Sequence, residues 1–207
     1  MNHPVRRAAA VLIAALTLLI SSCSARLVNL TYADGQMINK AKHLAYNAAP
    51  LNYEPASVGE EFAYYGKADI VLYEIVGLDP KEWLTEAYSG TATTVFYNEK
   101  ITLPTLSEMN PSKVFVCINE EITHAISTVE DPDIIGKLVD LFENGEYAEW
   151  PLVGSIKTYE LKFWSEKEYP YIYFNLTYGE FPEGKFLYDR TTKRSVMIGD
   201  LLDGYVW

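Results

Sequence analysis

The second half of the chain is dominated by short stretches in which apolar and polar residues alternate. In residues 157–164 and 171–178 every second residue is apolar, as in a β-strand with one buried face. These stretches are also rich in aromatic residues, which favour extended structure. The same criteria predict further strands over residues 69–76, 93–97, 113–118, 122–128, 185–189 and 194–198.

Helical spacing of apolar residues predicts three helices. The first covers residues 34–47, and the second covers residues 80–87, where Asp79 would be the N-cap. The third, over residues 132–144, has a wide apolar face and follows Asp131, a second N-cap candidate. Helices placed between runs of strands indicate an α+β fold, built of antiparallel sheet with a few short helices packed on one face.

The N-terminal residues have the features of an export signal. Arg6 and Arg7 precede an apolar run over residues 8–20, and small residues follow at Ser21 and Ser22. A membrane-spanning helix needs about 20 apolar residues, so this run is too short for one. We therefore predict a signal peptide over residues 1–22.

The end of this signal resembles a bacterial lipobox. The resemblance rests on residues 19–23, with the sequence Leu-Ile-Ser-Ser-Cys, in which Ile20 replaces the more usual leucine. It implies that Cys23 is lipidated and becomes the mature N-terminus, held in the cell membrane at its extracytoplasmic face. The alternative is an ordinary signal peptide cut nearby, with Cys23 incidental.

Residues 23–207 are predicted to form one domain, because this length is enough for a single well-buried core. The chain is thus expected to consist of a signal peptide and one domain. Within it, residues 23–66 are predicted to be the N-terminal helix followed by an irregular segment, because residues 50–66 mix Pro, Gly, Glu and Tyr without periodicity.

The mature chain is strongly acidic. The full sequence has 17 basic and 28 acidic residues and a net charge of −11, and loss of Arg6 and Arg7 with the signal leaves 15 − 28 = −13. Such a surface repels phosphate backbones and anionic head groups. A nucleic-acid partner is therefore not expected, and membrane contact should occur through the lipid on Cys23.

Part of the mature chain resembles uncharacterised lipoproteins of Gram-positive bacteria, of clostridial type. The resemblance rests on residues 127–142, followed by residues 159–163, and on residues 73–80. It implies a Gram-positive host and no known activity, so it assigns no functional residue.

No motif in the chain specifies catalysis, a cofactor or a metal. His43 and His124 have no metal-ligand spacing, and Asp131 and Asp133 are better explained as helix-capping residues than as a calcium loop. Cys117 lies in an apolar strand, where a thiol behaves as a small hydrophobe. We therefore predict no catalytic residue, no cofactor and no bound metal.

Aromatic residues on the predicted strands form a candidate binding face, consisting of Tyr159, Trp164, Tyr171 and Tyr173. Flat rings supply contact area for a glycan or a protein of the cell envelope at low entropy cost. The alternative is ordinary packing of a sheet, since aromatic residues are good strand formers.

These observations predict a lipid-anchored protein of the cell envelope, of non-catalytic binding or accessory type. One alternative is a cell-envelope hydrolase that uses paired carboxylates, for example on glycans. Another is an immunity-type or structural lipoprotein that recognises one protein partner.

Overall fold

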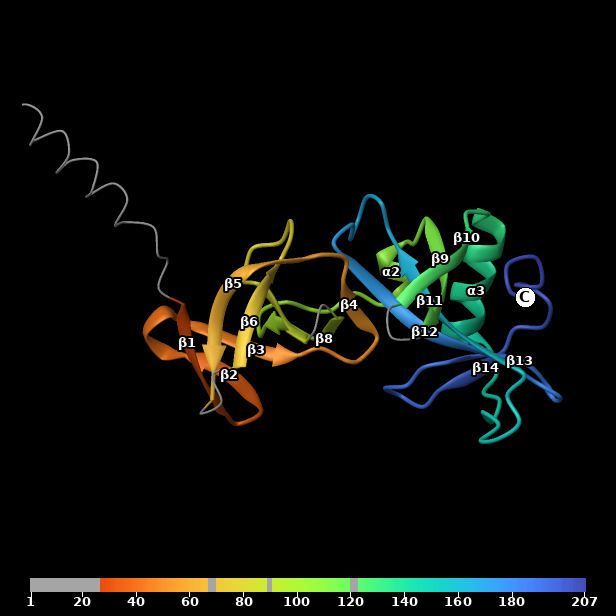
Figure 1. The fold of residues 1–207 in the computed structure, drawn as a ribbon, viewed down its shortest axis with the longest axis horizontal. Helices are drawn as coiled ribbons and strands as arrows, with labels where there is room; N and C mark the ends of the chain where they lie inside the picture. The colour runs from red at the N-terminus through yellow and green to blue at the C-terminus, as the bar shows by residue number, and fades with distance from the viewer. Residues whose placement is uncertain (1–26, 67–69, 89–90, 120–122) are drawn as a thin grey trace, which may run out of the picture.

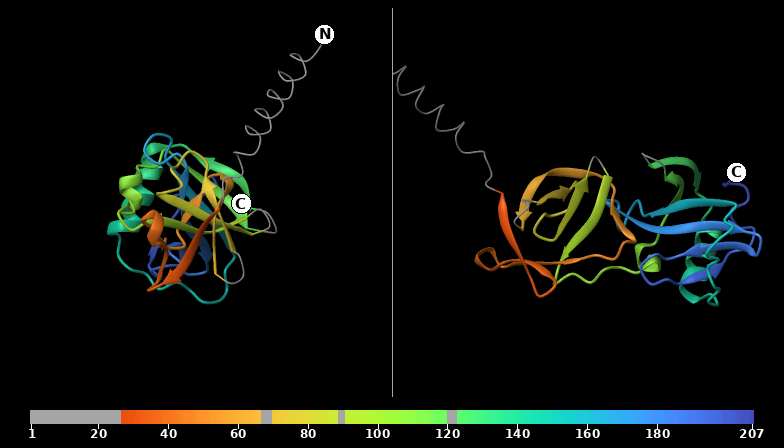
Figure 2. Two further views of the ribbon diagram at one scale, coloured as in Figure 1. Left: turned by 90° about the vertical axis from the view of Figure 1, so that its left-hand side faces the viewer. Right: turned by 60° about the horizontal axis from the view of Figure 1, so that its bottom comes forward.

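A computed structural model of the chain describes residues 27–66, 70–88, 91–119 and 123–207 (Figure 1). The predicted signal peptide and Cys23 lie outside these ranges. A β-barrel occupies the end nearer the N-terminus, and a second sheet with helices on one side occupies the other end (Figures 1 and 2). Antiparallel pairing predominates and the helices are short, which confirms the predicted fold class.

Seven strands close the barrel in the order β1-β2-β3-β8-β7-β6-β5. Closure is made by β1 and β5, which pair in parallel, while the other neighbours are antiparallel. The bounds are β1 Val28–Ala33, β2 Gln36–Asn39, β3 Leu44–Ala48, β5 Val58–Tyr65, β6 Ile70–Ile75, β7 Trp83–Tyr88 and β8 Thr91–Asn98, with a 3₁₀ turn, η1, at Lys40–Lys42. The interior is filled by apolar side chains from alternate positions: Val28, Leu30, Met37, Leu44, Tyr46, Ala63, Leu72, Leu84 and Phe96.

The helix predicted over residues 34–47 is wrong, because this segment forms strands β2 and β3. Asp34 and Gly35 both have positive φ, 54° and 84°, and make the two-residue turn of a hairpin in which Ala33 pairs with Gln36. The Asp-Gly pair is a hairpin signal that outweighs the helical spacing after it.

The helix predicted over residues 80–87, with Asp79 as its N-cap, is also wrong. Asp79 accepts a hydrogen bond from the Lys81 N–H at 2.9 Å, but only one turn follows. The chain then enters β7, where Trp83 and Leu84 are buried. In addition, the segment predicted to be irregular contains β4 (Tyr53–Pro55) and β5.

The second sheet runs in the order β10-β9-β11-β12-β13-β14, and β4 pairs with the first half of β12. Its bounds are β9 Lys113–Asn119, β10 Thr123–Val129, β11 Lys157–Trp164, β12 Ile172–Phe181, β13 Gly184–Tyr188 and β14 Ser195–Met197. Two helices, α2 (Leu106–Met109) and α3 (Pro132–Asn144), pack on one face of it. Asp131 caps α3, as predicted, by accepting from the N–H groups of Asp133 and Ile134.

Alternation along the central strands separates two faces of this sheet. The face that carries the helices is apolar and includes Val114, Val116, Leu161, Phe163 and Leu176, each at most 2% exposed. The opposite side, which we call the helix-free face, carries Cys117, Glu160, Lys162, Asn175 and Thr177.

A third apolar cluster joins the barrel to the second sheet. It contains Ile75, Trp83 and Val95 from the barrel and Ile172 from β12. Beside it the ring of Tyr171 lies against Gly77, where an added Cβ would be 2.2 Å from a ring carbon. The two sheets therefore share buried surface.

Replacement of Tyr46 by phenylalanine is predicted to destabilise the barrel. Tyr46 is fully buried and its hydroxyl donates to the carbonyl of Pro80 at 2.9 Å, so Tyr46→Phe leaves a carbonyl without its donor. We expect the free energy of unfolding to fall by about 1–2 kcal/mol, measured by urea denaturation. Tyr32→Phe, at a side chain that is 67% exposed, is the control and should change it by less than about 0.5 kcal/mol. Equal effects of the two changes would contradict this assignment.

Candidate functional site

Two of the four predicted aromatic residues lie together on the helix-free face. Trp164 and Tyr173 are opposite each other in the β11–β12 ladder, and both rings contact Phe115 of β9, with centroids 6.3 and 6.0 Å away. The Trp164 indole donates to the carbonyl of Pro170 at 2.9 Å. All three rings are half-buried, so they form a packed cluster with limited accessible area.

The other two residues are not part of this cluster. Tyr159 points to the helix side and is 7% exposed. Its ring packs on Tyr178, and its hydroxyl donates a hydrogen bond to the backbone oxygen of Trp207. Tyr171 precedes β12 and lies against Gly77 at the joint with the barrel. The prediction of one surface formed by all four residues was therefore wrong, because Tyr159 falls on the buried side of the alternation.

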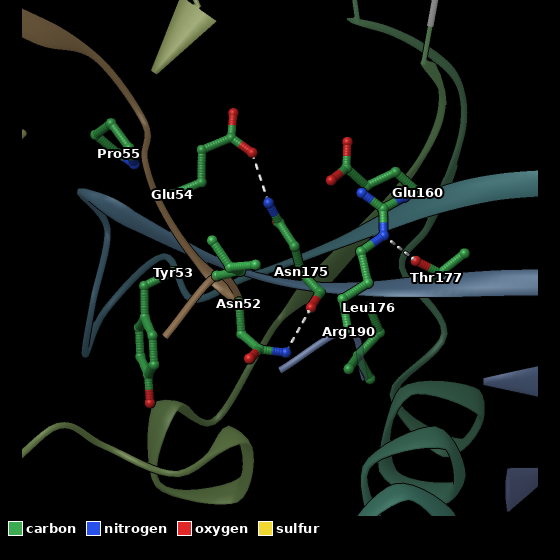
Figure 3. A pocket seen from close by; sticks show the side chains of 10 residues that line it. Asn52, Tyr53, Glu54, Pro55, Glu160, Asn175, Leu176, Thr177 and Arg190 are labelled. Atoms are coloured by element: carbon green, nitrogen blue, oxygen red, sulfur yellow. Dashed lines mark hydrogen bonds between the residues drawn. The ribbon is translucent and has the colours of Figure 1, made fainter. Parts of the chain in front are cut away.

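A pocket opens beside the aromatic cluster, where β4 lies along β12 (Figure 3). Its volume is about 220 Å³. Side chains come from β4, β11, β12, the segment before β4 and the turn after β13. The lining residues are Leu51, Asn52, Tyr53, Glu54, Pro55, Glu160, Asn175, Leu176, Thr177 and Arg190.

A closed charge pair stands at one wall of this pocket. Both carboxylate oxygens of Glu54 accept from the Lys162 ammonium, at 2.6 and 2.7 Å. Asn175 donates to the same carboxylate at 2.6 Å (Figure 3). The Lys162 side chain is 11% exposed and that of Glu54 25%, so the pair is largely withdrawn from water. Glu54 and Lys162 thus satisfy each other's charge.

Glu160 faces the same pocket without a direct partner. It lies on β11 opposite Thr177 of β12 and Cys117 of β9. Burial raises the pKa of its carboxyl above the ordinary range, Lys162 and Arg190 oppose that rise, and Glu54 adds to it. Within the described part of the chain Glu160 makes no hydrogen bond or ion pair.

Arg190 is placed over the pocket by a buried turn. Asp189 is 4% exposed, and its carboxylate accepts from the Asn52 amide at 2.9 Å and from the Thr191 N–H at 2.7 Å. This fixes the backbone just before Arg190, whose Nε donates to the Thr177 hydroxyl at 2.9 Å (Figure 3). The rest of the guanidinium has no hydrogen-bond or ion-pair partner among the described residues.

The pocket wall also holds an unsatisfied acceptor. The side-chain oxygen of Asn175 is buried and accepts no hydrogen bond from the residues described. A buried acceptor without a donor costs about 1–3 kcal/mol, so it needs a reason beyond stability. Asn175 is held in this orientation because its amide nitrogen is committed to Glu54.

Cys117 lies behind the charged residues and is chemically quiet. It is 3% exposed, and burial raises its thiol pKa to about 11 although Lys162 opposes the shift. Little thiolate forms at neutral pH, so Cys117 is not a nucleophile. This agrees with the structural role that its apolar strand predicted.

The described residues contain no group of three or more His, Cys, Asp or Glu side chains arranged to hold a metal ion. Among the same residues no helix is both long and apolar enough to cross a membrane.

No protein-family model matches the chain, and searches of curated proteins and of solved structures found no match either. The resemblance to Gram-positive lipoproteins therefore stays a prediction.

Breaking the Glu54–Lys162 pair is predicted to cost stability. Lys162→Met leaves a largely buried carboxylate without its cation, so we expect the free energy of unfolding to fall by about 2–3 kcal/mol. Adding Glu54→Gln should restore part of this loss, because the double variant carries no unpaired charge. Lys157→Met on the same strand is the control, since its pair with Glu180 is 3.5 Å long and more exposed and should contribute under about 1 kcal/mol. Additive effects of the two changes would rule out the coupling.

Glu160 is predicted to make stability depend on pH. Its pKa is raised from 4.5 by folding, so the native state holds this proton more tightly than the unfolded chain. The free energy of unfolding should therefore fall as pH rises from about 4.5 through the raised value, and the loss should persist at neutral pH. Glu160→Gln should remove that decline and unfold at higher denaturant concentration at pH 7. Glu183→Gln, at an exposed position, should not, and parallel curves for all three proteins would contradict the prediction.

Proposed function

We propose that this protein is a lipid-anchored component of the cell envelope that binds a small ligand and has no catalytic role. The lipobox-like sequence ending at Cys23 supports the anchor. The first strand begins at Val28, so a lipid on Cys23 would hold the barrel close to the membrane surface. Such a lipid would carry two acyl chains, enough for a stable tether.

One observation carries the binding role: a polar pocket is built from parts of the chain that are far apart in sequence. Glu54 and Lys162 are 108 positions apart, and Asn52 and Asp189 are 137 apart. Three charged side chains and an unsatisfied amide meet there, and Lys162 pairs with one of the three, although apolar residues would be less costly to bury. Charged residues retained at such a position are typical of a ligand site.

A hydrolase is the second candidate, favoured by the two carboxylates of the pocket. Glu160 has a raised pKa, as a general acid requires, while Glu54 is ion-paired with Lys162. Against this role, Glu54 is engaged by Lys162 at both oxygens and by Asn175, so it is poorly placed to attack a substrate or activate water. Docking of a partner protein on the aromatic residues has less support, because Tyr159 is buried and the rings of Trp164 and Tyr173 pack on Phe115, which leaves Tyr171 as the one exposed residue of the four.

Lipid attachment can be tested on the full chain in its host. The protein should be recovered with membranes, and the mass of its N-terminal peptide should show a diacylglyceryl-modified Cys23. Cys23→Ala should release it from the membrane fraction, whereas Cys117→Ala, at the buried thiol, should not. Release of both variants, or retention of both, would refute the anchor.

The binding role can be separated from hydrolysis by adding the small-molecule fraction of the envelope to the lipidated protein in detergent. We expect the NMR signals of the Asn175 amide and the Arg190 Nε–H to shift, with no loss of the ligand over time. Glu160→Gln should weaken the shifts and Glu183→Gln should not. Progressive consumption of a component, abolished by Glu160→Gln, would instead establish the hydrolase.

A further inference from the structure

The charges around the pocket fall into a closed pair and an open pair. Glu54 and Lys162 are joined at 2.6 and 2.7 Å and need no ligand. Glu160 and Arg190 are also of opposite sign and line the same cavity, yet they form no ion pair with each other. Arg190 is one of the charges that lower the pKa of Glu160, so the two groups lie within electrostatic range of each other. The open groups are therefore one carboxylate and one guanidinium.

We propose, on the basis of the binding role above, that the pocket takes a small zwitterion of the free amino acid class. The ammonium of the ligand pairs with Glu160, and its carboxylate pairs with the free N–H groups of Arg190. A zwitterion whose charges are separated by one carbon satisfies both groups at once. A single-charged ligand would satisfy one of them and leave the other uncompensated.

The size of the pocket agrees with a ligand of this class. Its volume of about 220 Å³ lies below the roughly 300–1,000 Å³ of sites for drug-sized molecules. Glycine and alanine are small enough to enter. Of the charged residues that line the pocket, Glu54 is neutralised by its ion pair with Lys162, which leaves one carboxylate and one guanidinium, so a simple anion or cation would meet a charge of each sign.

A sugar is less suited to this pocket. The aromatic ring in its lining, Tyr53, packs edge-on against Phe174 at 5.4 Å, and its hydroxyl donates to the carbonyl of Pro104 at 2.6 Å. Its ring and its hydroxyl are thus both engaged by the protein itself. The neutral hydroxyl groups of a sugar would hydrogen-bond to Glu160 and Arg190 without neutralising either charge.

The burial of Glu160 couples this binding mode to the release of a proton. Burial favours its protonated form, whereas a bound ammonium favours the carboxylate. Binding should therefore release a proton from Glu160 in mildly acidic buffer. Proton release on binding therefore distinguishes a ligand whose ammonium pairs with Glu160 from a ligand held elsewhere in the pocket.

The test uses the lipidated protein in detergent and follows the Asn175 amide and Arg190 Nε–H signals during titration. The probes are glycine and L-alanine, with methylammonium, acetate and glycerol as partial analogues. We expect glycine or L-alanine to bind at least tenfold more tightly than any analogue. Calorimetry at pH 5.5 in two buffers of different ionisation enthalpy should show proton release.

Variants assign the contacts. Glu160→Gln and Arg190→Gln should each weaken glycine binding at least tenfold, while Glu183→Gln and Lys167→Gln, at exposed positions outside the pocket, should leave it unchanged. Thermal unfolding of each variant shows that it is folded. Equal binding of methylammonium or acetate, or unchanged binding in both pocket variants, would overturn the proposal.

Failure of this inference can be told apart from failure of the binding role. If the envelope small-molecule fraction shifts the pocket signals and neither amino acid does, the pocket binds a ligand of another class and only the present inference is wrong. If neither the fraction nor any probe shifts them, both are wrong.

Discussion

The pairing of β4 with β12 is the interaction on which the rest of the architecture depends. Residues 52–56 leave the barrel and run along the first half of β12, with backbone hydrogen bonds extending from Asn52 to Ala56. That ladder brings Ile172 against the barrel residues of the shared apolar cluster. It also places Glu54 on the helix-free face, within reach of Lys162. The joint between the sheets and the wall of the pocket are thus one structural element.

Burial of charge on the helix-free face is the second constraint. Lys162 and Glu54 are tolerated because their charges meet at hydrogen-bond distance and Asn175 satisfies a further oxygen lone pair. An apolar pair of the same volume would often be equally stable or more so, so the pair is weak evidence for a gain in stability. Glu160 has no such partner among the described residues. Burial disfavours its charged form and therefore raises the pKa of its carboxyl.

The sequence predicts those parts of the structure that are determined by neighbouring residues, and not the contacts between segments that are far apart in the chain. The α3 helix, its Asp131 cap and the bounds of β11 were correctly predicted, since each follows from neighbouring residues. Residues 34–47 were assigned to a helix because apolar spacing was weighted above the Asp34-Gly35 turn. Alternation along β11 puts Glu160 and Lys162 on the face opposite Tyr159. No local pattern could predict that Glu54, in a segment without periodicity, would reach them, because that contact requires the register of β4 on β12.

The wide separation of the paired segments also sets the order in which the molecule can be completed. Barrel closure requires β1 to pair with β5. Strand β3 can pair only once β8 has been synthesised. Strand β4 can pair only once β12 has been synthesised, and β12 begins more than a hundred residues after β4. Contacts of such high sequence separation form slowly, because the intervening chain must be ordered first. During synthesis from the N-terminus, the pocket is incomplete until Arg190 has emerged. A chain that stops before β12 would therefore leave β4 without its partner strand.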